Sequence, residues 1–344
     1  MAREKVLTTV PEDDDRKKVD AALRPKFLKE VIGQRKVAQR LEIAVKASKK
    51  LKEPLGHILF DGPPGLGKTT FATVLPNELG TSIQTTSGPA LSKPADLLPF
   101  LTNLDEGSIL FIDEIHRMPR VVEEFIYPAM EDFRIDIVLG DGMSARTISM
   151  QLKRFTLIGA TTRSGMLSGP MRDRFKMHEH LEFYSVEDLA TIVRVNAAKL
   201  STPITDSAAH ELAHRSRGTP RVANARLHWA RSYSAAKHEG EITEEIARAA
   251  LDMAEVDRDG LDKNDRKYLE TLIDVFLGGP TGVEALAATL NLATDTLAEE
   301  IEPYLLREQY ITRSPRGRVA MPRAYEVLGR KVPRAKPEGP VLFD

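Results

Sequence analysis

The residues best suited to chemistry lie in segment 62–70, whose sequence GPPGLGKTT fits the phosphate-binding pattern G-x-x-x-x-G-K-[ST]. Glycines such as Gly65 and Gly67 let backbone N–H groups turn toward a phosphate. Lys68 can reach the β and γ oxygens, and the Thr69 hydroxyl is suited to Mg²⁺. A helix that begins near Gly67 would direct the positive end of its dipole at the same anion. The segment therefore predicts a nucleotide site.

The residues on either side of this loop supply the context that the motif requires. Residues 57–61 read HILFD, which predicts a short buried strand, and residues 69–75 have the apolar spacing of a helix. Pro76 falls inside that helix and predicts that it either bends or is short. Asp61 precedes the loop directly and would repel phosphate unless its side chain points away. A structural turn without a ligand is the alternative interpretation.

A second motif, about forty residues later, indicates hydrolysis rather than binding alone. The apolar run 109–112 leads directly into Asp113 and Glu114. A buried parallel strand delivers its carboxyl end to the ligand crevice, so both acids should lie beside the phosphates. Asp113 is suited to hold Mg²⁺, and Glu114 is suited to polarise the attacking water as general base. The alternative, a solvated turn at a strand end, is weakened by the upstream loop.

Two further polar segments follow. The apolar run 155–160 predicts a third strand with polar residues at its end, among them Thr162, which could position a lytic water. Segment 170–175, PMRDRF, contains Arg172 and Arg174, and an arginine supplied by a neighbouring subunit can stabilise a transferring phosphoryl group. Taken alone, such a cluster is more often a surface salt bridge. The spacing does not decide which arginine acts as the finger.

Length and composition limit the class of protein. A chain of 344 residues predicts two or three domains, and 42% hydrophobic with 29% charged residues at a net charge of −1 is ordinary for a globular protein. The absence of cysteine excludes disulfides and thiolate chemistry. The charged segment 1–20, expected to be a tail, lacks the apolar core of a signal peptide, and no apolar run is long enough for a membrane span. We therefore expect a cytoplasmic protein.

The remainder of the chain predicts two smaller domains. Residues 185–257 have helical periodicity and predict a small all-α lid, in which Arg221 follows a Gly-Thr-Pro turn. His228 and Trp229 are expected to serve helix packing. Residues 258–330 predict three helices, at 264–276, 281–290 and 295–308, followed by a basic hairpin, which is typical of a winged helix.

The basic hairpin predicts contact with the DNA backbone. Arg313, Arg316 and Arg318 lie in or beside its tight turn in a chain of nearly neutral charge. No residue is evident that would read bases, so we expect duplex binding that is independent of sequence and sensitive to salt. The basic run at residues 330–336 is interpreted as a solvated tail, with 331–344 outside the last domain.

The order of these motifs resembles the AAA+ ATPases, and longer strings resemble the RuvB family within them. The strings are ALRP at 22–25, IGQ at 32–34, TTSGP at 85–89, LTNL at 101–104, YPAMEDF at 127–133, LEFY at 181–184 and GTPR at 218–221. The resemblance implies an α/β AAA+ P-loop core at 21–184, the all-α lid and the C-terminal winged helix. It further implies ATP or ADP with Mg²⁺ as cofactors, Thr162 as first sensor, Arg174 as finger and Arg221 as second sensor. Metal contacts are expected from Thr69 and Asp113, and nucleotide contacts from Leu23, Arg24, Gly65, Gly67, Lys68, Thr69, Thr70, Glu131, Asp132, Phe133, Tyr184 and Arg221.

The same resemblance implies a function. RuvB-like proteins are motors that drive branch migration of Holliday junctions in recombination and repair, as rings on duplex DNA with a RuvA-type partner. A hexamer is therefore expected, and a junction resolvase is a possible further partner. Segment 134–148, with apolar residues alternating on either side of Gly-Asp-Gly, predicts a β-hairpin that would dock the RuvA-type protein through Ile135, Ile137 and Ile148. A purely structural hairpin is the alternative.

Two other functions remain open at this point. A clamp-loader subunit also joins an AAA+ core to a helical lid, but it would carry a helical collar in place of the basic winged helix. A DNA-binding regulator that uses ATP only as a switch would not need Glu114.

Overall fold

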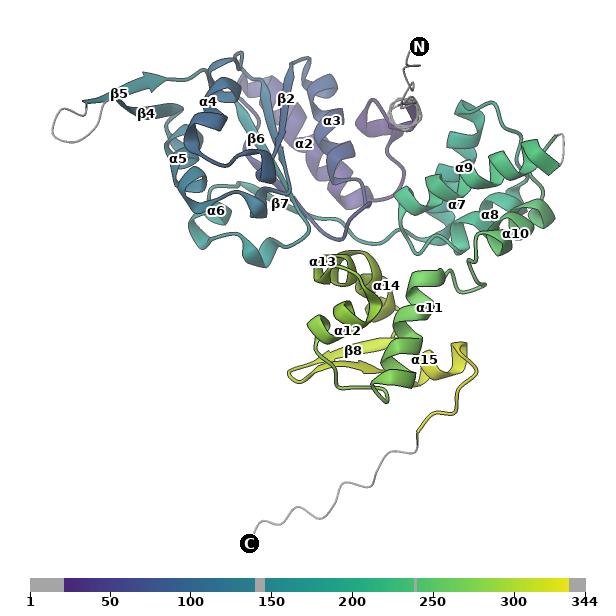
Figure 1. Cartoon of the computed structure of the whole chain (residues 1–344). Helices are drawn as coiled ribbons and strands as arrows, with labels where there is room; N and C mark the ends of the chain where they lie inside the picture. The colour runs from purple at the N-terminus through teal and green to yellow at the C-terminus, as the bar shows by residue number, and fades with distance from the viewer. Residues whose placement is uncertain (1–21, 140–145, 238–239, 334–344) are drawn as a thin grey trace, which may run out of the picture.

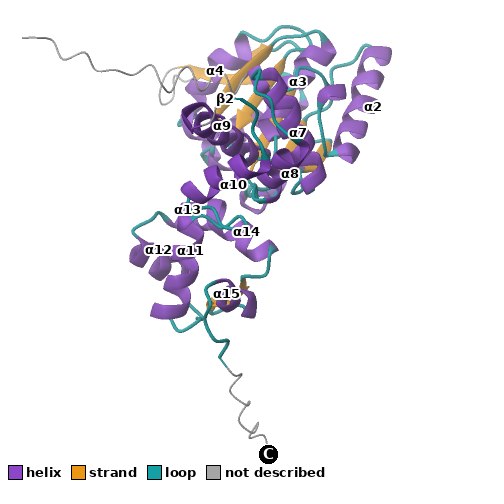
Figure 2. Ribbon diagram, turned by 90° about the vertical axis from the view of Figure 1, so that its right-hand side faces the viewer, coloured by secondary structure: helices purple, strands orange, loops and turns teal. Residues whose placement is uncertain are grey.

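A computed structural model describes residues 22–139, 146–237 and 240–333, which form three domains with separate hydrophobic cores. The large domain holds the phosphate loop, a helical lid follows it, and the last domain lies beneath both (Figures 1 and 2). Among the described residues, no helix combines the length and apolar character needed to cross a bilayer. The predicted class, an α/β AAA+ core with an all-α lid and a winged helix, is confirmed.

The large domain is built on a five-stranded sheet in which every strand pair is parallel. The strand order is β2-β3-β6-β1-β7, so β1 lies between two strands that come much later in the chain. All five carboxyl ends meet at one edge of this sheet, where ligands of open α/β sheets bind. The strands are β1 (Ile58–Asp61), β2 (Ile83–Ser87), β3 (Ile109–Asp113), β6 (Thr156–Thr161) and β7 (Met177–His180).

Helices cover both faces of this sheet because its strands are apolar on both sides. In β3, Ile109 and Phe111 pack against one helical layer, while Leu110 and Ile112 pack against the other. The first layer contains α2 (Arg35–Leu51) and α3 (Lys68–Leu79), and the second contains α4 (Pro94–Thr102), α5 (Arg120–Glu131) and α6 (Gly169–Asp173). Short 3₁₀ turns connect these elements in the described part of the domain: η1 (Leu28–Glu30), η2 (Gly88–Ala90), η3 (Ile115–Arg117) and η5 (Ser164–Met166).

Pro76 does not shorten the helix after the phosphate loop. Helix α3 continues through it to Leu79 and ends at Gly80, whose φ of 72° lies in the left-handed region typical of helix ends. Pro76 itself is buried, and its carbonyl accepts hydrogen bonds from Gly80 N at 2.8 Å and Thr81 N at 3.0 Å. The loop is therefore followed by a helix of 12 residues.

The predicted β-hairpin consists of β4 (Arg134–Leu139) and β5 (Arg146–Gln151), so it extends beyond residue 148; its tip, 140–145, lies outside the described residues. The prediction that Ile135 faces a partner is wrong, because this side chain is fully buried in the core beneath α5. Ile137 and Ile148 are directly paired across the two strands, and Ile148 is 51% exposed. The base of the hairpin thus packs on its own domain while the outer part projects from it (Figure 1).

The lid is a bundle of four helices with an alanine-rich core. Ser185, Thr205 and Thr243 cap α7, α8 and α10, each by accepting a hydrogen bond from a backbone N–H of the first turn. The helices are α7 (Val186–Lys199), α8 (Asp206–His214), α9 (Pro220–Lys237) and α10 (Glu244–Met253).

The last domain has the predicted pattern of three helical segments followed by a wing. Its core joins Tyr268, Leu286, Leu305 and Tyr310, and the wing is an antiparallel pair in which Arg313 lies opposite Arg318. The segments are α11 (Lys263–Glu270) continuing as η6 (Thr271–Val275), then α12 (Val283–Leu290), and then α13 (Thr294–Thr296), η7 (Leu297–Ile301) and α14 (Glu302–Arg307). The strands are β8 (Ile311–Ser314) and β9 (Gly317–Ala320), and α15 (Pro322–Val327) closes the domain.

Candidate functional site

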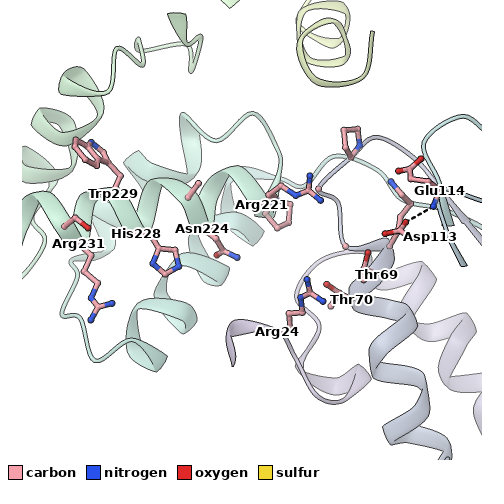
Figure 3. Close-up of a pocket in the computed structure, with 17 residues that line it drawn as sticks. Arg24, Thr69, Thr70, Asp113, Glu114, Arg221, Asn224, His228, Trp229 and Arg231 are labelled. Carbon is pink, nitrogen blue, oxygen red and sulfur yellow. Dashed lines mark hydrogen bonds between the residues drawn. The ribbon is translucent and has the colours of Figure 1, made fainter. Parts of the chain in front are cut away.

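A cavity of about 760 Å³ lies between the phosphate loop and helix α9 of the lid (Figure 3). The loop lines one side, and the acids at the end of β3 lie beside it. Arg221 and Asn224 face them from the lid. The sheet edge therefore brings the predicted residues Gly65, Gly67, Lys68, Thr69, Thr70, Asp113, Glu114 and Arg221 to one cavity.

Lys68 is held inside the loop. Its side-chain Nζ donates to the carbonyl oxygens of Gly62 at 2.7 Å and Pro63 at 2.9 Å. Burial lowers the pKa of Lys68 to about 8, and the nearby charges of Glu114 and Asp113 oppose that shift. A polyphosphate in the cavity would add a direct anionic partner for the buried ammonium group.

Glu114 is positioned by its backbone and by Thr162. Its φ of 47° places it in the left-handed region, and its N–H donates to Asp113 Oδ1 at 3.0 Å. Glu114 Oε2 accepts from Thr162 Oγ1 at 3.3 Å and lies 3.3 Å from His116 Nδ1. Burial, followed by the charge of Asp113, raises the pKa of Glu114. A carboxylate with a raised pKa beside a hydroxyl group at the strand edge is suited to activate water.

The residues suited to Mg²⁺ are Thr69 and Asp113, which both line this cavity. No cluster of three or more His, Cys, Asp or Glu side chains capable of holding a metal occurs among the described residues. Such a sparse donor set fits Mg²⁺, which usually keeps its waters and is bound through one or two carboxylates together with substrate phosphates. The ion would therefore enter with the nucleotide.

The lid contacts the phosphate loop at Gly65. This glycine has a φ of 78°, and a Cβ atom added to it would lie 2.7 Å from Thr219 Cγ2 and 3.0 Å from Arg221 Cβ. The Arg221 N–H points to the Gly65 carbonyl at 3.4 Å. Glycine is thus required both by the backbone conformation and by the close approach of the second-sensor segment.

A smaller cavity of about 110 Å³ adjoins the first and contains the predicted adenine contacts Leu23, Arg24 and Tyr184. The Tyr184 hydroxyl donates to the Leu66 carbonyl at 3.2 Å. Lys199 Nζ donates to the Leu23 carbonyl at 2.8 Å, which ties the N-terminal segment to the lid. The predicted base site therefore lies between the large domain and the lid.

The structure does not place Glu131, Asp132 and Phe133 in either cavity of this chain. The preceding residue, Met130, accepts a hydrogen bond from His57 Nε2 at 2.9 Å. His57 lies immediately before β1, at the amino edge of the sheet, whereas the phosphate loop follows the carboxyl end of that strand. The expectation that these three residues contact this chain's own nucleotide is therefore corrected.

Arg174 lies beside this displaced segment. Its Nη2 is 3.0 Å from Glu131 Oε1, its Nη1 donates to the Pro170 carbonyl at 2.7 Å, and its guanidinium lies 4.0 Å from the centre of the Tyr127 ring. Neither Arg174 nor the exposed Arg172 lines this chain's own cavity. The finger role that was predicted for one of these arginines therefore stays a prediction, and it would require the nucleotide of a neighbouring subunit.

Asp61 does not face the phosphate loop. Its Oδ2 lies 2.8 Å from His180 Nδ1, at the end of the neighbouring strand β7. The prediction that Asp61 repels phosphate unless its side chain points away is thus met by a carboxylate that is directed to β7.

Sequence reasoning missed several residues of the cavity wall on helix α9. Asn224, His228 and Trp229 line the cavity, although packing roles were expected for the last two. Trp229 does pack, since its indole N–H donates to the Ala250 carbonyl at 2.6 Å, yet the residue is 40% exposed. Their spacing of three, seven and eight residues from Arg221 places them on one helical face, and this pattern could have identified them.

The wing arginines differ in how far they reach solvent. Arg313 and Arg318 both pair with the fully buried Glu302, at 2.9 Å from each Nε, and Tyr268 donates to the same carboxylate at 3.1 Å. The Arg318 side chain is only 18% exposed, against 47% for Arg313. Arg316 is exposed at the turn between the strands. Arg318 therefore has a structural role that the sequence did not reveal.

Comparisons with known proteins agree along the chain. Residues 23–181 match the family described as the Holliday junction DNA helicase RuvB P-loop domain, 184–257 the RuvB AAA lid domain, and 258–329 the RuvB C-terminal winged helix domain. The Holliday junction branch migration complex subunit RuvB of Rhodopirellula baltica is 55% identical over 314 residues, which cover 91% of this chain and 86% of that protein.

Solved structures give the same result. The Thermotoga maritima RuvB Holliday junction branch migration motor has a TM-score of 0.84 at 44% identity and covers 91% of this chain and 100% of its own. A lysine-to-arginine variant of that protein has a TM-score of 0.85 at 44% identity, covering 90% of this chain and 99% of its own. The chain belongs to the RuvB family of AAA+ ATPases.

Proposed function

We propose that this chain is the ATP-driven motor that moves Holliday junctions along duplex DNA in recombination and repair. The observation that carries the proposal is the single cavity in which Lys68, Asp113 and Glu114 face Arg221 of the lid. This geometry lets the state of the nucleotide set the position of the lid, because Arg221 can contact a γ-phosphate only while that phosphate is present.

Each side chain has a task in the proposed hydrolysis. Lys68 binds the β- and γ-phosphates, while Thr69 and Asp113 hold Mg²⁺, which neutralises charge on the phosphates when bound. Glu114 accepts the proton of the attacking water, and the Thr162 hydroxyl, 3.3 Å from Glu114, orients that water. Arg24 and Tyr184 enclose the base.

The site is completed by a neighbouring copy. Arg174 projects away from its own cavity and would act as a finger on the next subunit, which closed rings of identical subunits allow. The adjacent residues 131–133 would contact that neighbour's nucleotide. A hexameric ring around the duplex is the assembly that we propose.

DNA and partner protein would bind to different domains of the chain. Arg313 and Arg316 present charge to the phosphate backbone, and Arg318 holds Arg313 in place through Glu302. The outer part of the β4–β5 hairpin, with Ile137 and Ile148, would dock the RuvA-type junction-binding protein. A junction resolvase could then act on the same complex.

The test is branch migration of a synthetic four-way junction with ATP and Mg²⁺, with and without a RuvA-type protein. We expect ATP-dependent conversion to duplex products, stimulated by the partner and abolished in Glu114→Gln. If the junction remains unchanged under both conditions while ATP is hydrolysed, the motor assignment fails. A clamp loader would instead require a sliding clamp for stimulation, and an ATP-switched regulator would bind DNA without turnover.

A further inference from the structure

The winged-helix domain reaches the ATPase site through its helical segment 294–301. Arg163, directly after the sensor residue, has its Nη2 2.7 Å from Asp295 Oδ1 and 2.6 Å from Glu299 Oε1. Both acids belong to the DNA-binding domain, more than 130 residues farther along the chain. In Figure 1, α13 lies on the side of that domain that faces the large domain.

The contact continues to the sensor itself. Thr162 Oγ1 lies 3.3 Å from Glu299 Oε2 and also 3.3 Å from Glu114 Oε2. A hydroxyl group has a single proton to donate, so the two carboxylates compete for it. While Glu299 takes part, the hydroxyl of Thr162 is not free to orient a water molecule.

The Glu299 carboxylate is partly buried and lies in an unusual backbone turn. The Glu299 side chain is 26% exposed and that of Glu114 is 32% exposed, while the nearby His116 is 3% exposed. Glu299 lies in η7, a five-residue π-helical turn within the helical run 294–307. Single π turns inside helices are rare and occur frequently at functional sites.

Electrostatic repulsion couples the position of the winged helix to the binding of ATP and of DNA. A γ-phosphate beside Thr162 would repel the Glu299 carboxylate, with little screening in a partly buried site. Binding of ATP should therefore push the winged helix away from the sensor. Such coupling is reciprocal. DNA binding that moves the winged helix away from Thr162 should therefore favour the ATP-bound, active state of the site.

We propose that Glu299 is a positioning residue that withholds the Thr162 hydroxyl from the lytic water until DNA or a neighbouring subunit moves the winged helix. We call the contact of Glu299 with Thr162 the latch. The ion pairs of Arg163 with Asp295 and Glu299 keep the winged helix in this closed position. The inference rests on the proposed role of Thr162 in hydrolysis. It explains how a DNA-binding domain can regulate a catalytic site that it does not itself contain.

The first test is steady-state ATP hydrolysis by Glu299→Ala without DNA. Allosteric couplings of 1–3 kcal/mol correspond to factors of about 5–150, so we expect kcat to rise about fivefold or more. KM for ATP should fall as well, because the variant lacks the carboxylate that the γ-phosphate repels. Stimulation by duplex DNA should shrink by the same factor. The matched control is Glu300→Ala, because Glu300 is the exposed neighbour of Glu299. If kcat of Glu299→Ala equals or falls below that of the control, the latch does not exist.

A double variant separates this inference from the proposed function. Thr162→Val should reduce hydrolysis, and in that background Glu299→Ala should produce no gain, because the two residues act through one hydroxyl. If Thr162→Val hydrolyses ATP at the wild-type rate, the sensor role itself fails. If Thr162→Val is impaired but Glu299→Ala still accelerates it, only the latch fails.

The second test observes the contact directly. The chain has no cysteine, so spin labels can be attached at two introduced cysteines without removing others. Met166→Cys, at a residue that is 60% exposed beside Arg163, and Glu300→Cys report the separation of the two domains. We expect a narrow, short distance distribution in the free protein and a longer one with duplex DNA and a non-hydrolysable ATP analogue. A distribution that does not change would overturn the proposal.

Discussion

Binding of ATP should take up a proton at mildly alkaline pH, because Lys68 is buried in the free protein. Its pKa is lowered to about 8, whereas an exposed lysine titrates near 10.4. The ammonium form is therefore complete well below pH 8 and is lost as the pH rises through 8. A bound polyphosphate restores the charged form, so nucleotide binding and protonation of Lys68 are coupled.

The size of the effect follows from this pKa. With a value of about 8, Lys68 is about nine-tenths charged at pH 7 and about one-tenth charged at pH 9, so the affinity for ATP should fall about tenfold over this range. Proton uptake at pH 9 should approach about 0.9 per nucleotide. The phosphates themselves, with second pKa values near 6, contribute little to this change.

Isothermal titration calorimetry in pairs of buffers with different ionisation enthalpies measures this uptake directly. The matched control is Lys68→Arg, because a guanidinium group stays charged throughout the range and its residual affinity should not depend on pH. If the wild-type chain takes up less than about 0.2 protons at pH 9, the lysine is not desolvated in the free protein and the reasoning is refuted.

Four other substitutions test separate parts of the chain. Glu114→Gln should leave the affinity for ATP within about twofold and lower kcat by about 10²-fold or more, measured by equilibrium binding and phosphate release; full turnover would remove Glu114 as the base. Gly65→Ala should weaken nucleotide binding, because its Cβ would lie 2.7 Å from Thr219 Cγ2 at a φ of 78°; fluorescence titration showing unchanged affinity would mean that the lid moves freely. Arg316→Ala should weaken binding equally to unrelated duplexes and reduce the log–log salt slope by about 0.9, as seen by anisotropy at several salt concentrations; a loss for one sequence alone would contradict backbone contact. Glu302→Ala should destabilise the winged helix by about 3–5 kcal/mol, because the buried carboxylate pairs with two arginines; calorimetry of the intact chain would show whether this domain melts earlier.

The elements around the phosphate loop were largely predictable because their signals are local. The strand before Gly62, the helix after Gly67 and the strand ending at Asp113 each have a periodicity that a short window contains. Pro76 was predicted to bend or shorten the helix. It does not shorten α3, which continues to Leu79, since packing of a buried helix can outweigh a local penalty.

Exposure along the hairpin was less predictable. Alternation correctly indicates two paired strands, but it does not say where the hairpin leaves the domain. Ile135 and Ile137 are two residues apart on the same strand, yet the former is buried under α5 while the latter is only partly covered. The position of the core boundary depends on a helix elsewhere in the chain.

The sequence by itself determined the chemistry, because each functional motif is contiguous and its residue types limit what it can do. These motifs are the phosphate loop, the two acids at a strand end, the polar sensor and the basic wing. Only the tertiary structure decided which distant side chains meet. Glu131 pairs with Arg174 and lies outside both cavities, Glu302 joins the two wing arginines, and Glu299 reaches Thr162. The reason is physical: periodicity along the chain reports which face of an element is buried, whereas ion pairs and hydrogen bonds act over about 3 Å and depend on how separate domains pack.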